Sequence, residues 1–358
     1  MITKKELIEQ IKNAVLAVFN NTGFIKIIKI KENAVSGILQ QLSDLSIEVQ
    51  TCDSFRYTLI FEIKTSGQPR YARMAISQLK EMVSKNTNYY GVFASIFISN
   101  ETRRICQENN IGFIDTASNC FFNFDNVFLS IEGKSNPFPN KRPLKTLFYS
   151  KLSRALRVLL CNPKKVWFVK DLSTEANISL GQASLVKKKL LEEESIEELE
   201  VDGLKKFKLI NPQKLLDEWA KNYSYNKNNI KNYYSLADTK AIESSIINYC
   251  NVKKIKYSFT LTSGASLVAP FLRYNRVFVY ILDNIETLAK DLNFKEVSTG
   301  SNVSILKPYD DGVFYNLQMV NGIKVVSNIQ LYLDLINYKE RGEEAAKFLY
   351  EQRISKSW

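Results

Sequence analysis

Four consecutive segments decide the fold of this chain: YSKLSRALRVLL (149–160), KKVWFVKDLSTEAN (164–177), ISLGQASLVKKKLLEEE (178–194) and SIEELEVDGLKKFKLI (195–210). The first predicts a helix with leucines on one face, ended by Asn162 and Pro163. The second predicts a short strand and a helix, and the third a helix with Ser179 as N-cap. The fourth predicts two strands joined at Asp202-Gly203. This order predicts a winged helix-turn-helix over residues 149–212.

Positive charge is concentrated in and before this segment. Ten Lys or Arg residues and no Asp or Glu lie from Lys134 to Lys170, in a chain whose formal net charge is +12. A polyphosphate favours such a stretch, because each neutralised phosphate releases condensed counterions. An anionic membrane surface would need a long amphipathic helix, which the stretch lacks. We therefore expect double-stranded DNA as the partner, and no membrane.

The helix that begins at Ser179 is the predicted recognition helix, because this helix of the motif enters the major groove. We expect Gln182 and Ser184 to read bases, while the inward face carries Leu180, Leu185, Val186 and Leu190. The whole predicted DNA-binding set is Arg154, Arg157, Lys164, Lys165, Ser179, Gln182, Ser184, Lys187, Lys188, Lys205 and Lys206. The alternative for Lys187 to Lys189 is a solvated helix face balanced by Glu192 to Glu194.

The remaining basic residues of the set are predicted to contact the DNA backbone. Arg154 and Arg157 lie one turn apart on the first helix, where they could reach phosphates. Lys205 and Lys206 lie on the predicted wing, which follows the same backbone.

Residues 1–133 alternate strands and helices, which predicts a mixed α/β domain with a fold like that of PD-(D/E)XK nucleases. In FEIK (61–64) Glu62 and Lys64 share one face of a strand that ends there. Nucleases of the PD-(D/E)XK class require this geometry, since carboxylates hold Mg²⁺ and a lysine activates water. The alternative is that Glu62 and Lys64 only form a charged strand end without catalytic function. The Pro-Asp pair that is usual in this nuclease class is absent.

The other residues of this candidate nuclease site follow from their positions around FEIK. The upstream carboxylate would be Asp44 or Glu48, and Gln78 would be a polar partner on the next helix. Asp44 and Glu62 would be the metal ligands, with Mg²⁺ as cofactor.

The rest of the chain completes an α/β multidomain architecture. Residues 134–148 form a basic, proline-containing linker, and residues 213–358 form a C-terminal α/β domain. The chain has no His, which excludes Ser-His-Asp catalysis and His-ligated zinc. Its five Cys show no C-x-x-C pair, and no apolar run could span a bilayer, so we expect a cytoplasmic protein.

The central segments resemble the AbiEi family of type IV toxin-antitoxin antitoxins. FEIKTSGQPRY (61–71) and IGFIDTASNCFF (111–122) resemble the N-terminal part of longer members. Three further segments resemble the C-terminal half of these proteins: LTSGASLVAPFLRY (261–274), NVSILKPYDDGVFY (302–315) and SNIQLYLDLINYKERGEEAAKFL (327–349). The resemblance, over about residues 44–358, implies a transcriptional regulator of its own promoter. It also implies neutralisation of a nucleotidyltransferase-like toxin.

The sequence therefore predicts a DNA-binding regulator and antitoxin that needs no cofactor and is not an enzyme. The alternative is a Mg²⁺-dependent DNA endonuclease that its winged helix targets to DNA. A third possibility is a structural adaptor with a relic nuclease fold.

Overall fold

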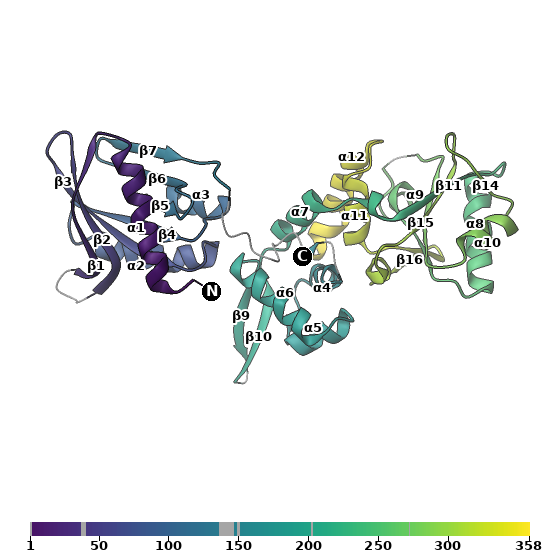
Figure 1. Ribbon diagram of the computed structural model, residues 1–358. Coiled ribbons are helices and arrows are strands. Elements are labelled where there is room, and N and C mark those ends of the chain that lie inside the picture. Colours follow the sequence, from purple (N-terminus) through teal and green to yellow (C-terminus); the bar gives the residue numbers. More distant parts are fainter. Residues whose placement is uncertain (1, 37–40, 136–146, 149–150, 202, 272) are drawn as a thin grey trace. The chain divides into compact units, whose positions relative to one another are not determined.

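The chain forms two compact units (Figure 1). A computed structural model describes all 358 residues except 1, 37–40, 136–146, 149–150, 202 and 272. The first unit comprises Met1–Lys141 with Glu192–Glu194, and the second comprises Arg142–Leu191 with Ser195–Trp358. Most of the predicted linker, 136–146, and residue 202 of the predicted hairpin turn lie outside the described residues.

The first unit is a seven-stranded mixed sheet with helices on both faces. Its elements are α1 (Lys4–Asn20), β1 (Ile25–Ser36), β2 (Gln41–Thr51), β3 (Arg56–Lys64), α2 (Pro69–Val83), β4 (Tyr89–Ser95), α3 (Asn100–Glu108), β5 (Gly112–Asp115), β6 (Cys120–Phe124) and β7 (Val127–Ile131). The strands lie side by side in chain order. Strands β3, β4 and β5 run parallel, and the other neighbouring pairs are antiparallel.

Strand β3 shows why both faces of this sheet are covered. Its residues Leu59, Phe61 and Ile63 belong to a core shared with α1. Ile60 points to the opposite face, into a second core shared with α2 and α3. Successive side chains of a strand alternate between faces, so a strand buried on both sides is apolar almost throughout.

The second unit begins with a small helical segment and a three-stranded sheet. Its elements are α4 (Ser153–Cys161), β8 (Val166–Trp167), α5 (Val169–Glu175), α6 (Leu180–Glu192), β9 (Ile196–Val201) and β10 (Leu204–Leu209). They follow the predicted order of helix, strand, helix, helix and hairpin. The sheet is antiparallel with the order β8-β10-β9, and Gly203 takes a φ of 71° in the hairpin turn.

The rest of the second unit is a mixed sheet in the order β14-β11-β15-β13-β12-β17-β16. Its strands are β11 (Asn229–Tyr234), β12 (Tyr257–Phe259), β13 (Val277–Ile281), β14 (Lys295–Glu296), β15 (Val303–Lys307), β16 (Gln318–Val320) and β17 (Ile323–Val325). Its helices are α7 (Pro212–Asn222), α8 (Thr239–Val252), α9 (Leu261–Val268), α10 (Ile285–Asp291), α11 (Asn328–Ile336), α12 (Gly342–Leu349) and α13 (Ser355–Ser357). Single turns are η2 (Tyr225–Lys227), η3 (Asp311–Phe314) and the π-helical η4 (Tyr350–Ile354).

The two segments of the second unit share one hydrophobic core. That core joins Leu156 of α4, Trp167 of β8 and Phe207 of β10 to Leu331 and Leu335 of α11. A separate core, under α8 and α10, covers the other face of the large sheet. The predicted mixed α/β class is therefore confirmed. No helix among the described residues has the length and apolarity that a membrane span requires.

Gly67 gives a test of the first unit's packing. A Cβ at this position would lie 2.0 Å from the carbonyl oxygen of Phe97, whereas one at Gly181 in α6 would meet nothing within 4 Å. We expect Gly67→Ala to lower the free energy of unfolding by roughly 1–3 kcal/mol, because backbone atoms must move. Urea unfolding followed by circular dichroism measures it. Gly181→Ala is the control, and an equal or smaller loss for Gly67→Ala would contradict this packing.

Candidate nucleic-acid interface and candidate metal centre

The first turn of α6 is fixed by a capping box. The Ser179 hydroxyl accepts a hydrogen bond from the Gln182 backbone N–H at 3.2 Å, and the Gln182 Oε1 accepts one from the Ser179 N–H at 2.9 Å. This confirms Ser179 as the N-cap. The capping box uses the amide oxygen of Gln182. The amide NH₂ group of this side chain can therefore still donate a hydrogen bond to a base.

The outer face of α6 is only partly as predicted. Ser184 and Lys188 are exposed. Lys187 is 17% exposed and lies 2.9 Å from the Glu198 carboxylate of β9. Leu180 was expected inside but is 56% exposed. Ala183 is buried instead, because it shares the helix face of Val186 and Leu190 at three- and seven-residue spacing.

The hairpin of β9 and β10 carries acids opposite its lysines. Lys205 is exposed and pairs in register with Glu200, and Lys208 lies 2.8 Å from Glu197. The Lys206 ammonium lies over the Phe168 ring, 4.8 Å from its centre. Cross-strand pairing thus offsets much of the positive charge of the predicted wing.

The turn between α4 and β8 keeps its charge. Lys164 and Lys165 are both exposed there, and Lys170 is exposed on α5. The Lys165 ammonium lies 3.9 Å from the centre of the Trp167 ring, which holds it without neutralising it. This turn, with Lys188, is the strongest candidate for phosphate contacts in the described part of the segment.

The predicted DNA contact of Arg157 is wrong because the side chain is buried, and Arg154 is held by a carboxylate. Arg157 is 0% exposed. Its guanidinium donates from Nε to Gln330 Oε1 and from Nη1 to the Ser153 hydroxyl, both at 2.9 Å. Arg154 pairs with Asp310 at 2.9 Å and is 16% exposed. Arg157 is enclosed by the second unit, whereas Arg154 is partly exposed and lines a surface pocket with Lys256 and Asp311.

Gln330 continues this polar network to a buried carboxylate. Its Nε2 donates to Asp334 at 2.9 Å, and Asp334 also accepts from the hydroxyls of Tyr223 at 2.6 Å and Thr260 at 2.5 Å. Burial raises the pKa of Asp334 to about 6, although these hydrogen bonds oppose the rise. Sequence reasoning missed the network, whose members are far apart in the chain.

The first unit brings Asp44, Glu62 and Lys64 together. Asp44 Oδ2 on β2 accepts a hydrogen bond at 2.9 Å from the backbone N–H of Ile63, between the other two residues. Glu62 is 7% exposed, and its carboxylate lies 2.5 Å from the Lys64 ammonium. The acid-lysine cluster predicted from FEIK is therefore present at the end of β3.

Glu48 and Gln78 do not join this cluster. Glu48 lies opposite Thr58, further along the sheet, and pairs with Lys31 at 3.4 Å. Gln78 is exposed on α2, whose buried face carries other residues. Of the two upstream acids that the sequence left open, Asp44 is the one beside Glu62.

Two further residues at this cluster were missed. Lys4 of α1 lies 2.5 Å from Asp44 Oδ1, and the buried Ser95 hydroxyl on β4 has no hydrogen-bond partner among the described residues. Ser95 pairs in register with Lys64, so both side chains lie on one face of the sheet. Ser95 could be identified as part of the cluster only from the pairing of strand β3 with strand β4.

The donor set is compatible with Mg²⁺, which proteins often hold through one or two carboxylates plus substrate phosphates. Asp44 and Glu62 would be those carboxylates, each released from its lysine. Across the described residues, no three Asp, Glu, Cys or His side chains gather as a metal site. A Mg²⁺ ion held by two carboxylates would complete its shell with water or substrate oxygens.

One known family matches part of this chain. Residues 208–355 match the family described as "Transcriptional regulator, AbiEi antitoxin, Type IV TA system". The resemblance noted in the sequence is thereby confirmed for the C-terminal part, which is less than half of the chain. A comparison with curated proteins gave no match.

Solved structures give only a weak likeness. The apo form of EndoMS is 12% identical over 29% of this chain and 45% of its own, and a repair endonuclease from Pyrococcus abyssi is 16% identical over 30% and 46%. The EndoMS-dsDNA2 complex is 12% identical over 29% and 42%. The chain thus spans less than half of each structure. The TM-score is 0.21 in all three, too low to support an argument about this chain.

The corrected role of Arg157 is testable. We expect Arg157→Met to lower the free energy of unfolding by on the order of 3 kcal/mol, because it removes charge-assisted hydrogen bonds to buried partners. Urea unfolding followed by tryptophan fluorescence measures the loss. Lys164→Met is the exposed control and should change stability little. A stable Arg157→Met variant with a reduced salt dependence of DNA binding would restore the phosphate-contact assignment.

Proposed function

We propose that this chain is a DNA-binding transcriptional regulator that acts as the antitoxin of a type IV toxin-antitoxin system. Residues 149–212 would be its winged helix-turn-helix, with which it binds its own promoter. The observation that carries the proposal is the family match over residues 208–355, which begins inside the hairpin β9–β10.

The geometry of residues 149–212 supports DNA binding by this segment. Its element order and its β8-β10-β9 sheet are those expected of a winged helix. The basic residues Lys164, Lys165 and Lys188 are exposed. Helix α6 also presents its positive N-terminal end, where backbone N–H groups favour a phosphate.

We assign base reading to Ser184 and to the amide nitrogen of Gln182 on α6. Lys188 would contact phosphates beside the groove, and Lys164 and Lys165 would contact them from the α4–β8 turn. Lys187 would contribute less, because the Glu198 carboxylate offsets its charge. Affinity would thus come mainly from the turn, and sequence preference from α6.

The C-terminal α/β segment, 213–358, would neutralise a nucleotidyltransferase-like toxin. This assignment rests on the sequence resemblance. Co-expression with a neighbouring toxin gene tests it: rescue of growth supports the antitoxin role, and continued toxicity at equal protein levels contradicts it.

Binding to the chain's own upstream DNA tests the regulator. We expect a sequence-preferring gel shift without cleavage, whose affinity falls linearly with salt on a double-logarithmic plot. Lys188→Ala should make that slope shallower by about 1, since one phosphate contact is lost. The control is Lys253→Ala, because Lys253 is exposed and lies in the C-terminal segment, 213–358. An unchanged slope in Lys188→Ala, or equal shifts with unrelated DNA, would contradict the proposal.

A second candidate function is a Mg²⁺-dependent DNA endonuclease, and the cluster of Asp44, Glu62 and Lys64 favours it. When bound by Asp44 and Glu62, Mg²⁺ would neutralise charge on the phosphodiester. Lys64 would orient the attacking water, and Lys4 would leave Asp44 before metal binding.

Cleavage of supercoiled plasmid tests the nuclease. We expect any Mg²⁺-dependent nicking to fall by about 100-fold or more in Lys64→Ala, because the water loses its positioning group. Lys85→Ala, a basic residue after α2, is the control. Nicking that survives Lys64→Ala would come from a contaminant or another site, and absence of nicking in the wild type would remove this candidate.

A further inference from the structure

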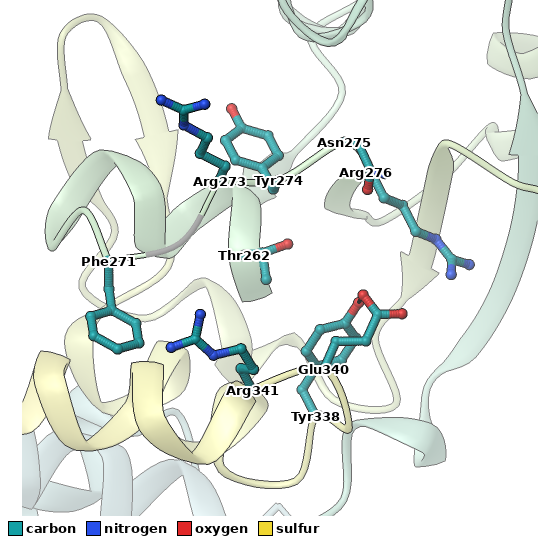
Figure 2. A pocket seen from close by; sticks show the side chains of 9 residues that line it. All are labelled: Thr262, Phe271, Arg273, Tyr274, Asn275, Arg276, Tyr338, Glu340 and Arg341. Carbon is teal, nitrogen blue, oxygen red and sulfur yellow. Dashed lines mark hydrogen bonds between the residues drawn. The ribbon is translucent and has the colours of Figure 1, made fainter.

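A cavity in the C-terminal part of the second unit is lined by three arginines. It has a volume of about 420 Å³, and its walls include Arg273, Arg276 and Arg341. Figure 2 shows Thr262 of α9 in the middle of the view, with Arg273 and Tyr274 above it and Arg341 and Tyr338 below. All of these residues lie outside the segment to which DNA binding is assigned.

Arg276 is a cation on this wall that neutral partners hold in place. Its Nε donates to the Ser304 hydroxyl at 2.7 Å and its Nη2 to Asn232 Oδ1 at 2.8 Å. The guanidinium also lies over the Phe278 ring, 5.1 Å from its centre. All three partners are neutral, so they orient the arginine without cancelling its charge, as a preorganised anion site requires.

Three arginines and one acid line the cavity, and two further acids lie behind its walls: Glu344 beside Arg341, and Glu243, which accepts a hydrogen bond from the Tyr274 hydroxyl at 2.6 Å. Arg273 is exposed and has no carboxylate partner in the described part of the chain. Arg341 pairs with Glu344 at 2.6 Å. Glu340 is the one acid on the wall and accepts a hydrogen bond from the Tyr338 hydroxyl at 3.1 Å.

We propose that this cavity binds a small molecule with two or more phosphates, either free pyrophosphate or a nucleoside polyphosphate. Arginine suits phosphate because its planar fork donates two hydrogen bonds to neighbouring oxygens. The Thr262 hydroxyl and the Asn275 amide supply further polar groups on the same wall. The volume is in the range of small-molecule sites, which favours a free ligand over a nucleic-acid strand.

Calorimetric titration of the full chain at constant ionic strength tests the site. The probes are sodium pyrophosphate, ATP and adenosine. We expect ATP and pyrophosphate to bind, and adenosine to bind far more weakly. Arg273→Ala should raise the Kd of ATP by about tenfold, while the control Lys253→Ala should change it by less than about twofold. Arg273 is exposed, so equal melting temperatures without ligand should confirm that the variant folds.

Each outcome of the titration either tests the phosphate site or distinguishes pyrophosphate from a nucleoside polyphosphate as its ligand. Equal affinity for pyrophosphate and ATP would support the phosphate site and remove the nucleoside from it. Adenosine binding as tightly as ATP, no binding of either phosphate, or ATP binding unchanged in Arg273→Ala would overturn the proposal. None of these results depends on whether residues 149–212 bind DNA.

Discussion

The second unit depends on the hydrogen bonds that the buried guanidinium of Arg157 makes. A charge without solvent is costly unless polar groups surround it. Here Ser153 and Gln330 accept its hydrogen bonds, and the Trp219 ring lies 4.9 Å from its carbon Cζ. Gln330 then links it to Asp334. These contacts fix α4 to α11, so residues 149–212 are held by the C-terminal segment and are not an independent module.

This arrangement relates the two proposed activities of the second unit. The shared core extends from Trp167 and Phe207 to α11 and α12. A DNA-reading helix α6 would therefore be positioned by the same packing that shapes the C-terminal segment. A ligand in the arginine-lined cavity would bind to that C-terminal segment, apart from the proposed DNA-binding surface.

Local patterns in the sequence predicted the local structure well. The N-cap at Ser179 and the hairpin at Gly203 follow from capping and turn rules. Strand β3 was expected to be half-buried, but it is buried on both faces, because helices cover both sides of the sheet. The cluster at the end of β3 was also predictable, because Glu62 and Lys64 are two residues apart on one strand. The choice of Asp44 over Glu48 needed the register between β2 and β3.

Long-range contacts could not be predicted in this way. Arg157 and Gln330 are 173 positions apart, and a basic residue beside a DNA-binding pattern looks the same whether it faces solvent or a core. The acids opposite the wing lysines were partly predictable, since pairing across Gly203 places Glu200 against Lys205. Lys4 and Ser95 depend on tertiary packing alone.

Native-state hydrogen exchange of a Gln330→Met variant tests most directly whether the second unit is one cooperative piece. The substitution removes the link between Arg157 and Asp334 from the α11 side. If α4 and α11 unfold together, amide protection in α4 and α6 should fall by the same free energy as protection in α11. A loss confined to α11, with wild-type protection in α4 and α6, would contradict the account.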